Sequence, residues 1–146
     1  MEQPQATGAR TKPDADVILF VCVACKGNAE NGERPGDALL AAVRGKLAGH
    51  GALNIVMEPV DCLAVCKRPC TVALTAKGKW TYVIGDLAGD AHADDVAAAT
   101  LAYASSRNGM IPWRERPQSF RKGVVARIPP LNFEHDGSGK PLEPKP

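Results

Sequence analysis

Five cysteines are the residues of this chain whose type and spacing could do chemistry. They stand as the pair Cys22-Val-Ala-Cys25, the pair Cys62-Leu-Ala-Val-Cys66, and Cys70 shortly after. Thiolates in short-spaced pairs of this kind converge on a zinc ion or an iron–sulfur cluster. We therefore predict a metal centre whose ligands are Cys22, Cys25, Cys62 and Cys66.

Two other roles of the cysteines have less support. Buried, inert cysteines are common, but burial does not explain three cysteines within one short turn. Thiol–disulfide exchange through Cys22 and Cys25 needs a helix amino end directly after the motif, and the next helix is expected only from Asp37. Metal binding is the interpretation that fits the pattern best.

The surroundings of the cysteines favour an iron–sulfur cluster over zinc. The residues between the paired cysteines are all apolar: Val23, Ala24, Leu63, Ala64 and Val65. Apolar neighbours shield a cluster and tune its potential. No histidine lies near the cysteines in sequence to complete a mixed zinc site, and the basic residues Lys26, Lys67 and Arg68 would offset thiolate charge. Zinc remains the alternative metal.

The cysteine pairs each follow an expected strand. The continuous apolar run Val17 to Cys22 is typical of a strand buried on both faces. Asp37 is expected to cap a helix with one apolar face, and alternating apolar residues predict a second strand over 53–60. Residues 71–76 and 80–84 flank a hairpin turn, and a second helix is expected from Asp94 or Asp95.

The predicted order of elements is β-α-β-β-β-α, which indicates an α/β fold. The long connection through the first helix suits parallel pairing of the first two strands, and the hairpin adds an antiparallel edge. Parallel strands end at the same sheet edge, so both cysteine pairs are expected there side by side. This arrangement matches a thioredoxin-like domain that lacks its extra N-terminal elements.

The chain is expected to consist of one domain with two tails. Residues 1–15 read as a disordered leader, residues 16–106 as the thioredoxin-like metal-binding domain, and residues 107–146 as a proline-rich basic tail. Residues 107–128 carry six basic residues and one acidic residue, for a net charge of +5. With Trp113 as an aromatic anchor, this tail could dock on an acidic partner or fold back over its own sheet.

Composition excludes several other classes of function. The formal charge of +2 gives no argument for nucleic acid or membrane binding. The amino end has no apolar run typical of a signal peptide or anchor, so we expect a cytoplasmic protein whose thiols stay reduced. No catalytic triad or phosphate-binding glycine loop is present, and we do not expect an enzyme.

Four blocks of sequence together resemble a known family, the domain of unknown function 1636 family, whose members are labelled predicted metal-binding proteins. The blocks are VILFVC ending at Cys22, DCLAVCKRPCTVAL from Asp61, KWTYVIGDL from Lys79 and IPWRERP from Ile111. The resemblance covers roughly residues 17–130. Family members are often associated with cobalamin and cobalt metabolism, so the resemblance implies a role in that pathway.

The first three blocks also resemble the thioredoxin-like 2Fe–2S ferredoxins. This resemblance implies a 2Fe–2S cluster, with Cys22 as the first ligand and Cys62 with Cys66 as the last pair. Cys25 would replace a second ligand that lies further along the loop in those ferredoxins. Cys70 is surplus to their pattern, and it could be a core cysteine, a spare ligand or the fourth ligand in place of Cys25.

We therefore expect a ferredoxin-like electron carrier that passes one electron to a redox partner protein with an acidic docking surface. The alternatives are a zinc- or cobalt-binding module or metal chaperone that acts with a partner enzyme, and a structural zinc domain for protein interaction. Whether the protein is a monomer or a homodimer stays open.

Overall fold

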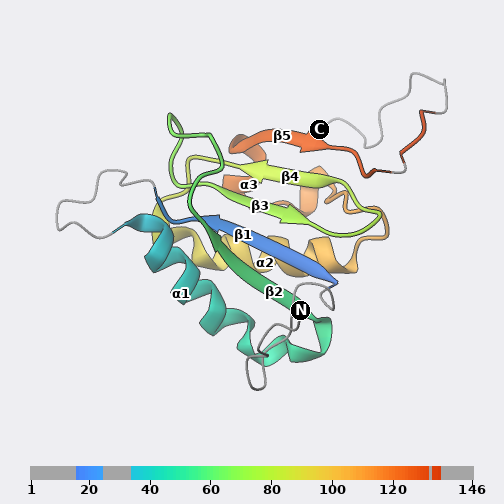
Figure 1. Ribbon diagram of the computed structural model, residues 1–146. Helices are drawn as coiled ribbons and strands as arrows, with labels where there is room; N and C mark the ends of the chain where they lie inside the picture. Colours follow the sequence, from blue (N-terminus) through green and yellow to red (C-terminus); the bar gives the residue numbers. More distant parts are fainter. Residues whose placement is uncertain (1–15, 25–33, 132, 136–146) are drawn as a thin grey trace, which may run out of the picture.

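The computed structural model describes residues 16–24, 34–131 and 133–135 of the chain (Figure 1). The predicted leader over residues 1–15 lies outside the described residues, as do Cys25 and Lys26.

A five-stranded mixed sheet forms the centre of the molecule, in the order β2-β1-β3-β4-β5. Its strands are β1 (Val17–Cys22), β2 (Ile55–Val60), β3 (Val72–Thr75), β4 (Thr81–Ile84) and β5 (Val124–Ile128). β1 pairs with β2 in parallel, and β1–β3, β3–β4 and β4–β5 are antiparallel pairs. The predicted α/β class, the parallel first pair and the hairpin are confirmed.

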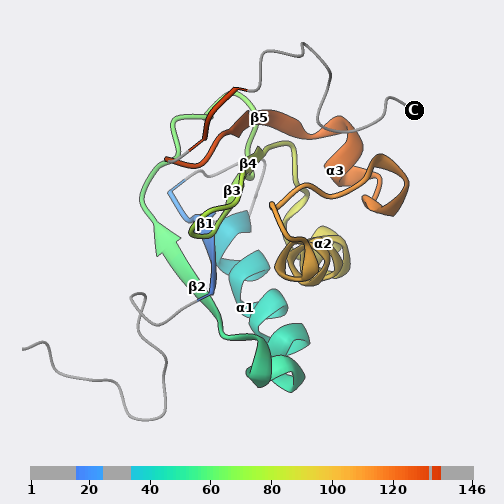
Figure 2. The same cartoon turned by 90° about the vertical axis from the view of Figure 1, so that its right-hand side faces the viewer.

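The helices α1 (Pro35–Leu47), α2 (Ala93–Ser105) and α3 (Ser119–Lys122) lie on the same face of this sheet, as the side view shows (Figure 2). Short 3-10 helices precede β2, α2 and α3, namely η2 (Ala48–Leu53), η3 (Gly89–His92) and η4 (Trp113–Glu115). Within the described ranges, no helix combines the length and apolarity needed to cross a bilayer.

Both main helices begin slightly before the predicted residues. Asp37 does not cap α1: the N-cap is Arg34, and Pro35 takes the first helical position, where its fixed φ suits the helix and its missing N–H costs nothing. Asp37 instead lies in the first turn, where its negative charge interacts favourably with the helix dipole. Asp94 and Asp95 take the same place in α2, which begins at Ala93.

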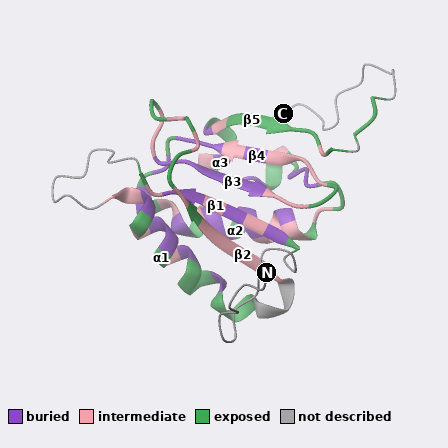
Figure 3. Cartoon of the chain, in the orientation of Figure 1, coloured by how far each residue is buried: buried purple, intermediate pink, exposed green. Residues whose placement is uncertain are grey.

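The core fills the space between the helices and one face of the sheet (Figure 3). On β1, Val17, Leu19 and Val21 point into this core and are fully buried, whereas Ile18 and Phe20 are only half-buried. The expectation that this strand is buried on both faces is therefore wrong, because the described helices cover one face only. The continuous apolar run of β1 therefore forms a strand that is fully buried on one face only.

The segment after α2 packs against the sheet from Met110 to β5. Ile111 and Phe120 are fully buried in the core, and β5 extends the sheet beyond β4. The register between β4 and β5 shifts near Val83 and Ile84. The sequence pattern does not predict this fifth strand. Residues 110–128, which belong to the expected tail, pack against the chain's own sheet.

Candidate metal centre

The carboxyl ends of β1 and β2 lie side by side, at the left of the sheet in Figure 1. Cys22 is the register partner of Val60, two residues before Cys62. Just beyond the strands, the Val23 amide donates to the Val60 carbonyl at 2.9 Å. The fold thus brings the Cys22 segment and the Cys62 segment to one edge of the sheet, as the sequence predicts.

The third cysteine segment joins the same edge through β3. The Cys22 amide donates to the carbonyl of Thr71 at 2.9 Å, and Thr71 directly follows Cys70. Because β1 is the neighbour of both β2 and β3, its last residue stands between the beginning and the end of the turn formed by residues 61–70, hereafter the cysteine turn. One central strand therefore positions all the described cysteine segments.

The four described cysteines differ in burial. Cys22 and Cys70 are each 1% exposed, whereas Cys62 and Cys66 are exposed to solvent. In the described part of the chain, no three Cys, His, Asp or Glu side chains are grouped closely enough to hold a metal ion. Cys25, the remaining predicted ligand, lies outside the described residues, so the four-cysteine ligand set stays a prediction.

Cys62 receives a hydrogen bond that sequence reasoning did not find. The backbone amide of Ala64 donates to the Cys62 Sγ at 3.1 Å. Ala64 has a φ of 64°, in the left-handed region that non-glycine residues rarely adopt. An N–H directed at sulfur favours the negatively charged sulfur of a metal-bound cysteine. This backbone conformation therefore suits Cys62 for a ligand role.

Cys70 sits in a different environment from the exposed pair. Its side chain packs in the hydrophobic core, and its backbone exchanges two hydrogen bonds with Leu87, at 3.0 and 3.1 Å. The core packing matches one of the three roles open to Cys70 from sequence. Its role as a ligand in place of Cys25 remains a prediction.

The amino end of α1 also reaches this edge. A Cβ at Gly36 would overlap the carbonyl of Cys22, so the first turn of α1 lies directly against the end of β1. The Arg34 guanidinium donates to the carbonyl of Ala24, one residue before Cys25. The fold thus brings the first turn of α1 against the backbone of Cys22, although the helix begins only at Pro35.

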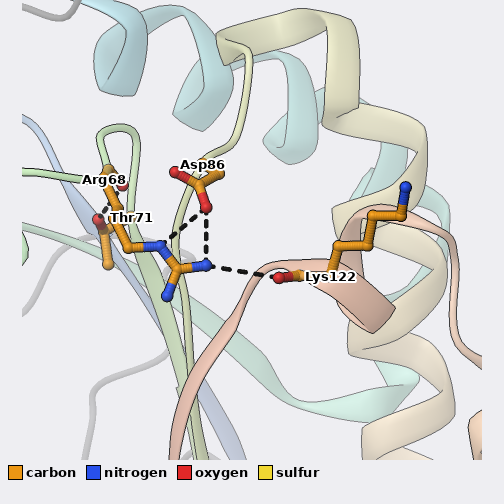
Figure 4. Close-up of polar contacts among 4 residues, drawn as sticks. All are labelled: Arg68, Thr71, Asp86 and Lys122. Atoms are coloured by element: carbon orange, nitrogen blue, oxygen red, sulfur yellow. Dashed lines mark hydrogen bonds and ion pairs between the residues drawn. The ribbon is translucent and has the colours of Figure 1, made fainter.

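The basic residues of the cysteine turn have different roles. Arg68 pairs with Asp86 through Nε at 2.8 Å and Nη2 at 2.7 Å (Figure 4). Lys67 is exposed, and no ion-pair partner for it exists among the residues that the structure describes. The charge of Lys67 is therefore available to a thiolate or a partner, whereas that of Arg68 is matched within the fold.

The fold and the position of the cysteines define a thioredoxin-like α/β protein whose described cysteine segments meet at one sheet edge. The chain belongs to the family described as protein of unknown function (DUF1636), whose model matches residues 19–130. The predicted family is thereby confirmed. No curated protein matches the chain.

Two solved structures that this chain is similar to are ferredoxins. A thioredoxin-like [2Fe–2S] ferredoxin from Aquifex aeolicus superposes with a TM-score of 0.51 at 18% identity, over 82% of this chain and 99% of that one. A second structure, described as the wild-type ferredoxin from the same organism, gives a TM-score of 0.49 at 14% identity, over 77% of this chain and 98% of that one. The first likeness confirms the predicted thioredoxin-like fold.

Proposed function

We propose that this protein is an electron carrier whose 2Fe–2S cluster is held by Cys22, Cys25, Cys62 and Cys66. The observation that carries the proposal is the parallel pairing of β1 with β2, which ends both strands at one edge with a cysteine segment after each. The fold that this chain shares with a solved [2Fe–2S] ferredoxin gives further support.

The donor set fits such a group in chemistry. Thiolates are the ligands that iron–sulfur clusters require, and the N–H directed at the Cys62 sulfur is of the kind that tunes cluster potentials. When bound, the cluster would supply one-electron transfer. Among the proposed ligands, Cys62 and Cys66 are exposed to solvent and Cys22 is buried, so a partner would reach the bound cluster from the side of the exposed pair.

The proposed role needs an electron-transfer partner and no substrate chemistry. Lys67 is an exposed positive charge within the cysteine turn, where an acidic partner would approach. Several arginines of the segment 107–128 are engaged within the fold: Arg116 bonds to Ile111 and Tyr82, and Arg121 to Trp113 and Arg114. We extend the proposal, on the family resemblance, to a partner in cobalt or cobalamin metabolism.

A visible absorption spectrum of anaerobically purified protein tests the proposal. Iron, sulfide and broad visible bands that bleach with dithionite would support a 2Fe–2S centre. A colourless protein with stoichiometric zinc would contradict it and would favour the zinc-binding alternative, since four thiolates also suit zinc.

Single Cys→Ser variants then identify the ligands. Cys62→Ser and Cys66→Ser should each lose the visible bands or shift them. Cys25→Ser and Cys70→Ser are a matched pair, because only the fourth ligand should change the spectrum. If Cys22→Ser and Cys62→Ser both retain the unaltered spectrum, the shared site at the ends of β1 and β2 is wrong.

A further inference from the structure

Three segments distant in sequence meet around the side chain of Arg68 (Figure 4). Its guanidinium binds the Asp86 carboxylate through Nε and Nη2, and Nη2 also donates to the Lys122 carbonyl at 3.4 Å. Asp86 follows β4, and Lys122 ends α3. Arg68 itself lies in the cysteine turn, between Cys66 and Cys70.

The backbone of Arg68 is held at the same place. Its carbonyl accepts the Asp86 amide at 2.9 Å and the Thr71 hydroxyl at 3.2 Å. Arg68 and Asp86 are therefore joined twice, once between side chains and once between backbones. The left-handed φ of 62° at Asp86 turns its amide toward Arg68 while its carboxylate meets the guanidinium.

The backbones at this junction are packed too closely for side chains on the glycines. A Cβ at Gly85 would lie 2.9 Å from the Arg68 carbonyl oxygen, and a Cβ at Gly123 would lie 2.7 Å from the Gly85 carbonyl oxygen. The Gly85 amide donates to the Gly123 carbonyl at 2.8 Å. The cysteine turn thus packs against residues 85–87, and these residues pack against the end of α3.

The first half of the cysteine turn has fewer backbone contacts. Beyond the Ala64 amide on Cys62 and the Arg68 amide on Val65, at 3.0 Å, no backbone hydrogen bond of residues 61–67 is found within the described part of the chain. The end of β2 holds Cys62 near β1, whereas the position of Cys66 relative to β1 depends on the anchored end of the turn, where Arg68 and Cys70 bind Asp86 and Leu87.

We propose that Arg68 and Asp86 form a clamp that holds the cysteine turn in its ligand-presenting conformation before any metal binds. The inference rests on the proposed function for its purpose, and it makes Arg68 a positioning residue that touches no metal. Its side chain is 35% exposed and that of Asp86 is 53% exposed, so the pair contributes little to global stability and acts locally.

Amide hydrogen exchange of the metal-free, full-length protein tests the clamp directly. In Arg68→Met and Asp86→Asn, the amides of Arg68, Cys70 and Asp86 should exchange about fivefold faster than in the wild type. The amides of Leu19 and Leu74 in the central strands should be unchanged, which shows that each variant is folded. The double variant should exchange no faster than either single one, because both remove the same pair.

Arg44→Met is the matched control. Arg44 is exposed on α1, and no side-chain bond of it is found in the described ranges, so the variant removes the same charge without touching the junction. Exchange in the cysteine turn should be unaltered in this control. Wild-type exchange rates at Arg68, Cys70 and Asp86 in both clamp variants would overturn the proposal.

Metal loading gives the second readout. With Co²⁺ as a probe, Arg68→Met should bind with about fivefold weaker affinity than the wild type and Arg44→Met with wild-type affinity. A wild-type protein that binds neither iron nor cobalt would end the proposed function and leave the exchange result standing. Accelerated exchange without any change in Co²⁺ affinity would show that the clamp does not serve metal binding, and would overturn that part of the inference.

Discussion

Ala64 and Arg116 each have a role that depends on an unusual backbone conformation or on burial. Ala64 adopts a left-handed φ, and its amide donates to the Cys62 sulfur. Arg116, whose neighbours in sequence suggest a charged tail, is 7% exposed and donates to the Ile111 carbonyl and the Tyr82 hydroxyl. Neither role is visible in sequence, because a left-handed alanine and a buried arginine both depend on tertiary contacts.

Replacing Ala64 with glycine should stabilise the protein. Glycine adopts the left-handed conformation without the Cβ penalty, so we expect a gain of about 1 kcal/mol in the free energy of unfolding, partly offset by chain entropy. Urea unfolding measures it. Ala41→Gly, at an exposed position of α1, is the control and should lose about 1 kcal/mol. A loss in both variants would contradict the conformation described for Ala64.

Replacing Arg116 with methionine should destabilise the protein. The change leaves the buried Ile111 carbonyl without its 2.8 Å donor and removes one donor from the Tyr82 hydroxyl. We expect a loss of about 2 kcal/mol in the free energy of unfolding. The exposed Arg114 provides the comparison, since Arg114→Met should change stability by less than about 0.5 kcal/mol. Equal effects would indicate that Arg116 is a surface residue.

At the scale of elements, α1 and β5 show where sequence patterns succeed and fail. The helix over α1 follows from its apolar spacing, although its start shifts to Pro35. The sequence does not predict β5 (Val124–Ile128). The segment is short, includes Arg127 and precedes Pro129, and each of these features argues against a strand. Its place beside β4 is decided by the burial of Phe120 and Ile111, which local sequence does not reveal.

The contact between α1 and β1 should be intolerant of any added side chain. In Gly36→Ala, the new Cβ would meet backbone atoms of Cys22 and Val23, which cannot shift without moving β1. We expect a loss of about 3 kcal/mol in the free energy of unfolding. Gly45→Ala in the same helix meets nothing within 4 Å and should gain about 0.8 kcal/mol. Similar effects of both changes would refute the close approach of α1 to Cys22.

For the whole molecule, the arrangement of the cysteine segments was predictable and the filling of the core was not. An apolar run before Cys22 and alternation before Cys62 suffice to predict two parallel strands that end together, because topology leaves few other connections. The contact between Arg68 and Asp86 joins residues on different elements. Such contacts arise from packing and carry no local signal.

Alkaline stability should depend on Tyr103. Burial, with a smaller contribution from Tyr82, raises the pKa of Tyr103 above its ordinary value of 10.0. The folded state therefore keeps a proton that the unfolded state loses, and stability falls as pH rises above 10. Burial lowers the pKa of Lys79, although the charge of Asp16 opposes this shift. The unfolded state therefore binds more protons at Lys79 than the folded state, so Lys79 adds stability as pH rises toward 10.5 and offsets part of the loss due to Tyr103.

Tyr103→Phe separates the contribution of Tyr103 to the pH dependence of stability from that of Lys79. The variant loses the hydroxyl bond to the Trp80 carbonyl, 2.5 Å long, so it should be less stable than the wild type near neutral pH. Its stability should decline less steeply than that of the wild type between about pH 9 and pH 11. Parallel curves, from urea unfolding at each pH, would show that Tyr103 does not titrate differently in the two states.

The position of β1 between β2 and β3 has a consequence for biosynthesis. Cys22 emerges early from the ribosome, whereas β2 is translated only after α1, and β3 only after the cysteine turn. Under the proposed function, all four ligands have been translated by Cys66, but β1 lacks its antiparallel neighbour until β3 has been made. Insertion of the cluster into the folded site must then await translation of β3, even though the last ligand is already present.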